Sequence, residues 1–182
     1  AQTFHSACVR ILHRDADRLG FPNNFTIYDT GDSQSIMKRI IREKDLDDKT
    51  YPYKMVLSRI SKIKDAMLTP EQYAAEAAKS ADIRTRKIAE LYSAYSRRLR
   101  EAGAMDFDDL LYYTVRLLEG NEDVRRFYQE KFKYVLIDEY QDTNNLQYRF
   151  ASLLAGERRN ICVVGDDDQS IYKFRGATIE NI

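Results

Sequence analysis

Residues 134–143 read YVLIDEYQDT, four apolar residues that run directly into a segment with three carboxylates and a glutamine. An apolar run of this kind is typical of a strand in a buried parallel sheet, and ligands of such sheets bind beyond the carboxyl ends of the strands. Asp138 and Glu139 therefore lie where a nucleotide and its metal ion would bind.

A second apolar run repeats this arrangement downstream. Residues 161–164 (ICVV) lead into Gly165 and Asp166, and DDQSIYKFRGA follows over residues 167–177. Crossover connections are almost always right-handed, and they join parallel strands. We therefore expect a βαβ unit in which Asp138 and Asp166 are neighbours at one edge of the sheet.

The segment between these strands has the pattern of a crossover helix. Thr143 or Asn144 is the expected N-cap, and Gly156 is expected to end the helix. The apolar residues recur at helical spacing. They are Leu146, Phe150, Leu153 and Leu154.

Three segments resemble motifs of a known family, the UvrD/Rep/PcrA-type superfamily 1 DNA helicases. DEYQDT at residues 138–143 resembles motif II, GDDDQSIYKFRGA at 165–177 resembles motif III, and TFHS at 3–6 resembles motif Ib. DFDDLL at 106–111 matches a weaker family motif, and the similarity extends along essentially the whole chain. The resemblance implies an α/β fold, a partial parallel-sheet P-loop NTPase (RecA-like) motor domain with an all-α helical insert.

The same resemblance implies a domain organisation. Residues 1–20 and 104–182 would be parts of the nucleotide-binding subdomain 1A, and residues 21–103 would be the inserted helical subdomain 1B. None of the seven glycines is followed by lysine, so the sequence has no GxxxxGK[ST] phosphate loop. In the family that loop precedes TFHS, and a second motor domain with a γ-phosphate arginine follows motif III. We therefore expect an internal fragment that is inactive alone.

Two adjacent carboxylates at a strand end can divide the labour of ATP hydrolysis between a metal ion and a water molecule. The family roles imply that Asp138 holds Mg²⁺ and that Glu139 activates the attacking water. Gln169 matches the glutamine that links the γ-phosphate of ATP to DNA. The alternative is structural: the carboxylates cap loop amides, and Gln169 makes an ordinary loop hydrogen bond.

Two groups of residues are candidates for contact with single-stranded DNA. Tyr172, Phe174 and Arg175 follow Gln169 closely, and aromatic faces stack on bases with about 1–3 kcal/mol each. The family often has tryptophan at Phe174, whereas this chain has none, and core packing is the alternative for both rings.

The second group places hydroxyls and an imidazole at a predicted helix N-terminus, where free N–H groups favour a DNA phosphate. A plain capping motif is its alternative. This group is Thr3, Phe4, His5 and Ser6.

Helices are predicted for most of the chain before Lys133. Thr69 to Gln72 has the N-cap, first-turn proline and capping-box glutamine of a helix start, and Gly103 is expected to end a long helix. Asp106 and Asn121 are expected N-caps, and no catalytic role is assigned to Asp106. Apolar residues at helical spacing indicate faces that pack on one another. They include Cys8, Ile11, Leu12, Ile36, Met37, Ile40, Ile41, Val56, Ile60, Ile63, Ile88, Leu91, Tyr92, Tyr95 and Leu99.

The composition is that of a soluble protein: 43% of the 182 residues are hydrophobic, 32% are charged and the formal net charge is zero. No segment has the roughly 20 apolar residues of a membrane span, and we expect a cytoplasmic protein. Basic clusters at residues 62–64, 84–87 and 97–100 are interpreted as solvated helix faces rather than DNA contacts. Cys8 and Cys162 are interpreted as free buried thiols, and no metal site involving them is expected.

The sequence thus predicts part of an ATP-dependent 3′–5′ DNA helicase. Such an enzyme would use ATP and Mg²⁺ on single-stranded DNA and its junctions with duplex, in repair or replication. The alternative is a non-enzymatic single-strand-binding or partner-docking module that keeps the helicase shape. A nuclease-fused relative stays open as well.

Overall fold

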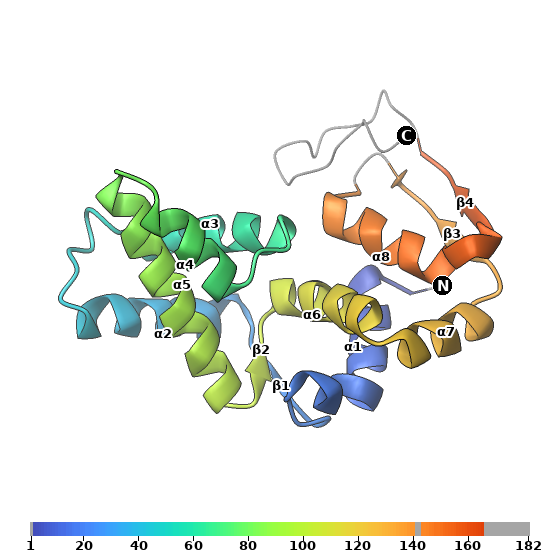
Figure 1. The fold of residues 1–182 in the computed structure, drawn as a ribbon. Helices are drawn as coiled ribbons and strands as arrows, with labels where there is room; N and C mark the ends of the chain where they lie inside the picture. Colours follow the sequence, from blue (N-terminus) through green and yellow to red (C-terminus); the bar gives the residue numbers. More distant parts are fainter. Residues whose placement is uncertain (1, 141–142, 166–182) are drawn as a thin grey trace. The chain divides into compact units, whose positions relative to one another are not determined.

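The computed structural model describes residues 2–140 and 143–165, and the chain divides into two compact units (Figure 1). Residues 20–110 form the first, here called the helical unit; residues 1–19 and 111–182 form the second, the α/β unit. None of the described helices is both long and apolar enough to cross a bilayer. Several residues of the motifs quoted above lie outside the described part. They are Gln141, Asp142, Asp166, Gln169, Tyr172, Phe174 and Arg175.

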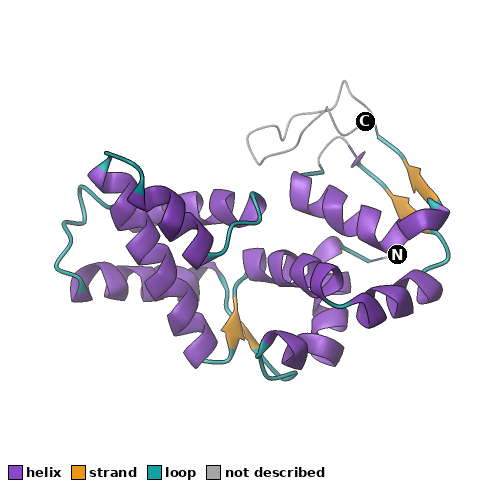
Figure 2. Cartoon of the chain, viewed as in Figure 1, coloured by secondary structure: helices purple, strands orange, loops and turns teal. Residues whose placement is uncertain are grey.

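The helical unit contains four complete helices and two very short strands (Figure 2). In chain order these are β1 Thr26–Ile27, α2 Thr30–Glu43, α3 Tyr53–Asp65, α4 Pro70–Ala78, α5 Ile83–Glu101 and β2 Ala104–Met105. The apolar faces of α2, α3 and α5 meet in one buried core, as their helical spacing predicts. This core includes Ile36, Met37, Ile40, Ile41, Val56, Ile60, Ile63, Ile88, Leu91, Tyr92, Tyr95 and Leu99.

The predicted helix ends in this unit are confirmed. Thr69 caps α4 in a reciprocal capping box with Gln72, and Pro70 occupies the first turn. Gly103 follows α5 with φ +59°, and a Cβ atom there would lie 3.1 Å from Cγ of Pro22. A side chain at this position would therefore meet both backbone strain and crowding.

The parallel pairing of β1 with β2 is not predicted by the sequence. Thr26 pairs with Ala104 and Ile27 with Met105. Strands of two residues are too short to show an alternation of apolar and polar side chains. β2 and the first turn of the next helix, α6 (Phe107–Gly120), belong to the compact helical unit, which ends at Leu110.

A buried ionic cluster joins α3 to the start of α6 within the helical unit. Lys64 is only 2% exposed, and its Nζ lies 2.9 Å from Oδ2 of Asp106 and 2.8 Å from Oδ1 of Asp109. The hydroxyl of Tyr95 donates to Asp106 at 2.9 Å. The interpretation of residues 62–64 as a solvated face is therefore wrong for Lys64, because its ammonium is satisfied by carboxylates that are distant in sequence.

Asp106 keeps the capping role that the sequence predicts. The backbone N–H of Asp109 donates to Oδ1 of Asp106 at 2.7 Å, and the N–H of Asp106 donates back to Asp109 at 3.2 Å. Asn121 differs: it occupies the N-cap position of α7 (Glu122–Lys131) but makes no side-chain capping bond. Its Nδ2 instead donates to the carbonyl of Leu117 in the preceding helix, at 3.0 Å.

The α/β unit contains the predicted βαβ arrangement. Its other elements are α1 Phe4–Asp15, η1 Ala16–Leu19, β3 Val135–Ile137, α8 Asn145–Ala155, η3 Gly156–Arg158 and β4 Ile161–Val163. β3 and β4 pair in parallel, with Leu136 opposite Cys162. Asn144 is the N-cap of α8 in a capping box with Gln147, and Gly156 follows the helix with φ +56°.

The two strands are less buried than the sequence suggests. Tyr134 and Leu136 are both 75% exposed, and Cys162 is a free, exposed thiol. Val135 and Ile137 point to the opposite face, where Ala151 of α8 packs on them. Within the described residues this sheet has two strands, and α8 covers one of its faces. Cys162 is exposed, so the expectation that its thiol is buried is wrong. Cys8, in contrast, is fully buried, which raises the pKa of its thiol to about 12.

Candidate functional site

The carboxylate pair Asp138 and Glu139 lies directly at the carboxyl end of β3. Both residues are exposed. The backbone N–H of Glu139 donates to Oδ1 of Asp138 at 3.0 Å, so one carboxylate folds back on the loop that carries both. Part of the structural alternative is thus present, because Asp138 does cap a loop amide.

The backbone of Glu139 has φ +53°, in the left-handed region. A residue with a Cβ atom pays roughly 1–2 kcal/mol for this conformation, which glycine adopts freely. Strained residues of this kind concentrate at functional sites, where the surrounding structure holds them in place. The glutamate side chain is therefore kept at a position that backbone energetics alone would give to glycine.

Hydrogen bonds to Val164, the residue after β4, hold the loop on which the two carboxylates lie. The N–H of Val164 donates to the carbonyl of Ile137 at 2.8 Å, and the N–H of Tyr140 donates to the carbonyl of Val164 at 2.9 Å. Tyr140 is buried, which raises the pKa of its hydroxyl, and Tyr148 adds to the shift. Ile137 and Tyr140, the residues on either side of Asp138 and Glu139, are thus buried and hydrogen-bonded to Val164.

The N-terminus of α1 supplies the second part of the site. Oγ1 of Thr3 accepts from the N–H of Ser6 at 3.2 Å and lies 2.9 Å from the Ser6 hydroxyl. Phe4 packs edge-on against Phe150 of α8, with ring centroids 6.2 Å apart. Its ring thus contributes to the core of the α/β unit, while His5 is half-buried.

A cavity of about 880 Å³ in the α/β unit joins these two parts. Thr3, Phe4 and His5 line it from α1, and Asp138 lines it from the end of β3. Ser6 and Glu139, although described, are not among the residues that line it. The structure therefore brings the predicted strand-end aspartate together with most of the TFHS segment, which is 132 positions away from it or more in sequence.

Arg10 also lines this cavity and was not predicted as a site residue. It is exposed, and it is the one lysine or arginine among the described lining residues. A signal for it exists in the sequence, since Thr3, Ala7 and Arg10 recur at the spacing of one helix face and all three line the cavity.

The residues present fit a magnesium ion better than they fit phosphate groups. Mg²⁺ is usually held by one or two carboxylates, with water and substrate phosphates completing the octahedron, and exposed Asp138 offers such a carboxylate. No cluster of three or more His, Cys, Asp or Glu ligands exists among the described residues. The sequence contains no GxxxxGK[ST] loop to hold phosphates.

Comparison with known proteins places the chain in a family. Residues 1–182 match the UvrD/REP helicase N-terminal domain. The ATP-dependent DNA helicase PcrA of Staphylococcus aureus is 48% identical over 180 residues, 99% of this chain and 24% of that protein. The ATP-dependent DNA helicase PcrA of Staphylococcus epidermidis is 46% identical over 180 residues, again 99% of this chain and 24% of that protein. The chain therefore spans about a quarter of the length of these curated relatives. With a match along its whole length, the chain belongs to the UvrD/REP helicase N-terminal domain family.

Proposed function

We propose that this chain forms part of the first motor domain of an ATP-dependent DNA helicase. The observation that carries the proposal is the exposed pair Asp138 and Glu139 at the carboxyl end of β3, with Glu139 in a left-handed backbone conformation. Ligands of parallel sheets bind at this edge. The family match and the names of the relatives support the same activity.

The domain assignment follows from the same proposal. Residues 1–20 and 104–182 correspond to parts of a RecA-like subdomain 1A, and residues 21–103 correspond to the helical subdomain 1B. The parallel β3–β4 pair with α8 as its crossover helix supports the RecA-like assignment.

In this function Asp138 would hold Mg²⁺, and Glu139 would orient and activate the attacking water. MgATP, when bound, supplies the phosphate bond that is hydrolysed. Gln169 senses the γ-phosphate. A neutral amide suits that role because it can donate and accept without competing for the metal.

Single-stranded DNA is the proposed track. Thr3, His5 and Ser6 offer polar groups at the start of α1, where N–H groups attract a phosphate. Phe4 is a weaker candidate for direct contact, because its ring packs on Phe150. Tyr172, Phe174 and Arg175 stay predicted contacts. The 3′–5′ direction, the action at junctions with duplex DNA, the role in repair or replication and the cytoplasmic location rest on the family resemblance.

Glu139→Gln tests the proposal in the full-length helicase that carries this chain. The variant should bind MgATP with unchanged affinity, because Asp138 is intact, while DNA-stimulated hydrolysis falls by orders of magnitude. Binding is measured by calorimetry and turnover by phosphate release. Glu130→Gln, a change at an exposed glutamate of α7, is the matched control and should leave both quantities unchanged.

Near-normal hydrolysis in Glu139→Gln would remove the assigned role. If single-stranded DNA still bound tightly while no variant of Asp138 or Glu139 altered ATP turnover, the chain would instead be a binding module that keeps the helicase shape.

A further inference from the structure

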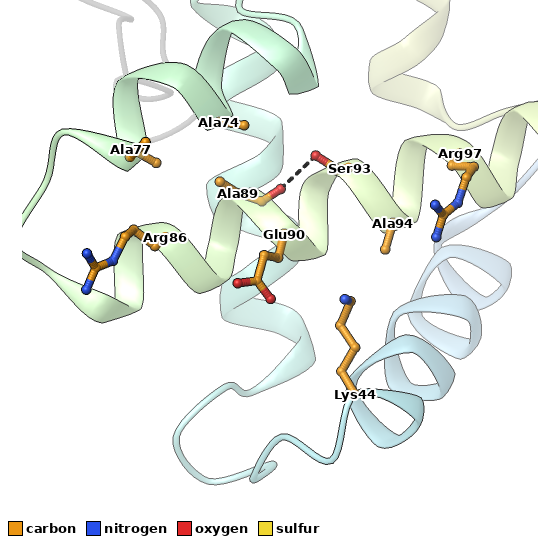
Figure 3. Close-up of a pocket in the computed structure, with 10 residues that line it drawn as sticks. Lys44, Ala74, Ala77, Arg86, Ala89, Glu90, Ser93, Ala94 and Arg97 are labelled. Carbon is orange, nitrogen blue, oxygen red and sulfur yellow. Dashed lines mark hydrogen bonds between the residues drawn. The ribbon is translucent and has the colours of Figure 1, made fainter.

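A groove on the helical unit lies outside everything assigned above. It has a volume of about 410 Å³ and runs between α4 and α5, with the end of α2 beside it (Figure 3). Its floor is made of alanines, of which Ala77 and Ala89 are buried. The five alanines that line it are Ala74, Ala77, Ala78, Ala89 and Ala94.

Basic side chains flank this floor. Arg86 and Arg97 come from the two ends of the α5 stretch that lines the groove, and Lys44 comes from the C-terminus of α2. All three are exposed. Within the described residues Lys44 and Arg86 form no ion pair, and the guanidinium of Arg97 is 3.9 Å from Glu101 in a largely exposed contact.

The one acid in the lining is already neutralised. Both carboxylate oxygens of Glu90 accept from Nζ of Lys87 at 3.0 Å. The hydroxyl of Ser93 donates to the carbonyl of Ala89 at 3.0 Å (Figure 3). The groove therefore combines an apolar floor with a rim of three cations, two of which have no ion-pair partner among the described residues.

We propose that this groove binds an acidic segment of a partner protein, with small apolar side chains on the alanine floor and carboxylates at Lys44, Arg86 and Arg97. Alanine side chains allow a second backbone to approach closely, and rim cations determine which partner is accepted. The stretch of α5 from Arg86 to Arg97 is about 16 Å long at the rise of an α-helix, which matches three helical turns or about five extended residues.

A protein segment fits this groove better than nucleic acid. No aromatic side chain lines it for base stacking, and a sugar-phosphate backbone would gain nothing from five methyl groups. A peptide, in contrast, can place apolar side chains on the floor and carboxylates on the rim at the same time.

The test uses the 182-residue chain and a synthetic peptide of about twelve residues in which glutamates alternate with blocks of alanine. NMR amide shifts are followed during titration, with a glutamine-for-glutamate peptide and a thymidine oligonucleotide in parallel. We expect saturable shifts confined to α4, α5 and the end of α2, with an affinity in the micromolar to millimolar range of a transient contact.

Variants separate charge from shape. The double variant Arg86→Glu with Arg97→Glu should weaken peptide binding about ten-fold or more, and Ala78→Leu, at an exposed lining position, should weaken it without changing charge. Arg59→Glu is the matched control, since Arg59 is exposed on α3 and does not line the groove. It should keep affinity within about two-fold.

Three results would overturn the proposal. These are the absence of saturable groove shifts with millimolar glutamate peptide, equal binding of the glutamine peptide, and larger shifts at the groove with the oligonucleotide than with the peptide. None depends on ATP hydrolysis, so the groove and the proposed motor function can fail independently.

Discussion

Lys64 illustrates at the scale of a single residue how a charge is held inside the helical unit. Its ammonium contacts Asp106 and Asp109, and Asp106 also accepts from Tyr95. A buried ion loses its hydration, and only close partners with satisfied hydrogen bonds compensate for that loss. The Lys64 cluster therefore stabilises α3 and the start of α6 only while every member is present.

At pH 8, where both buried carboxylates are ionised, Lys64→Met should destabilise the protein by about 3–5 kcal/mol, because Asp106 and Asp109 lose their counter-ion. Chemical denaturation followed by circular dichroism measures this. Lys62→Met, two residues earlier on the exposed side of α3, is the control and should change the unfolding free energy by less than about 0.5 kcal/mol. Equal effects of the two substitutions would contradict the ionic role of the cluster.

The same cluster predicts a pH dependence. Burial, together with the negative charge of Asp106, raises the pKa of Asp109 to about 7, whereas Lys64 keeps the pKa of Asp106 below its usual value of 3.8. Between about pH 4 and 7 the folded state then binds a proton at Asp109 that the unfolded state releases. The contribution of Asp109 to stability is complete below pH 3.8 and is lost as the pH rises to about 7.

Unfolding free energies from pH 4 to pH 8 should therefore fall more steeply for the natural chain than for Asp109→Asn. Asp65, whose pKa burial raises to about 6, titrates in both proteins and cancels in the difference. If the unfolding free energies of the natural chain and of Asp109→Asn changed with pH in parallel, Asp109 would be ionised throughout this range.

At the scale of elements, the sequence predicts helices well where local chemistry determines both ends. Thr3, Thr69 and Asn144 cap their helices with side-chain bonds, and each lies before a run of apolar residues at helical spacing. Asn121 fails as a predicted cap because a competing carbonyl, that of Leu117, lies within its reach. A sequence pattern that predicts an N-cap does not determine which backbone group the side chain will hydrogen-bond.

Contacts between residues far apart in the sequence cannot be predicted from local sequence patterns. Lys64 meets Asp106 across 42 positions. Its position four residues after Ile60 places it on the buried face of α3, unlike Lys62, but no local pattern identifies the carboxylates that pair with it. The carboxylate pair at the end of β3 was predictable from an apolar run ending in acids. The left-handed backbone of Glu139 was not, since glutamate has no preference for that conformation.

The exposed face of β3 gives a prediction for this strand. Tyr134 and Leu136 present apolar surface on the side of the sheet that α8 does not cover, and such patches drive association. Leu136→Lys should lower the self-association of the chain in sedimentation velocity at high concentration. Ile83→Lys, which removes an exposed apolar side chain at the start of α5, is the control and should leave the association unchanged. A monomeric natural chain would refute the prediction.

For the molecule as a whole, Asp138 and Glu139 are not expected to suffice for ATP hydrolysis. Carboxylates attract a cation but repel three phosphates, and the sequence has no GxxxxGK[ST] loop to offset that repulsion. The 182-residue chain should show no saturable MgATP binding at micromolar concentrations by calorimetry. It should also release no phosphate with excess single-stranded DNA. Steady turnover would mean that the nucleotide is held by groups other than those assigned.

The pairing of β1 with β2 has a consequence for how the helical unit is built into the chain. Thr26, close to where the unit begins, lies beside Ala104, close to where it ends, at the roughly 4.8 Å spacing of neighbouring strands. A module whose entry and exit are adjacent closes on itself, so that about eighty residues can be added to a host at a single point of its backbone. The helical unit is thus suited to circular permutation and to transfer as a cassette, with its old ends joined by a short linker across the β1–β2 pair.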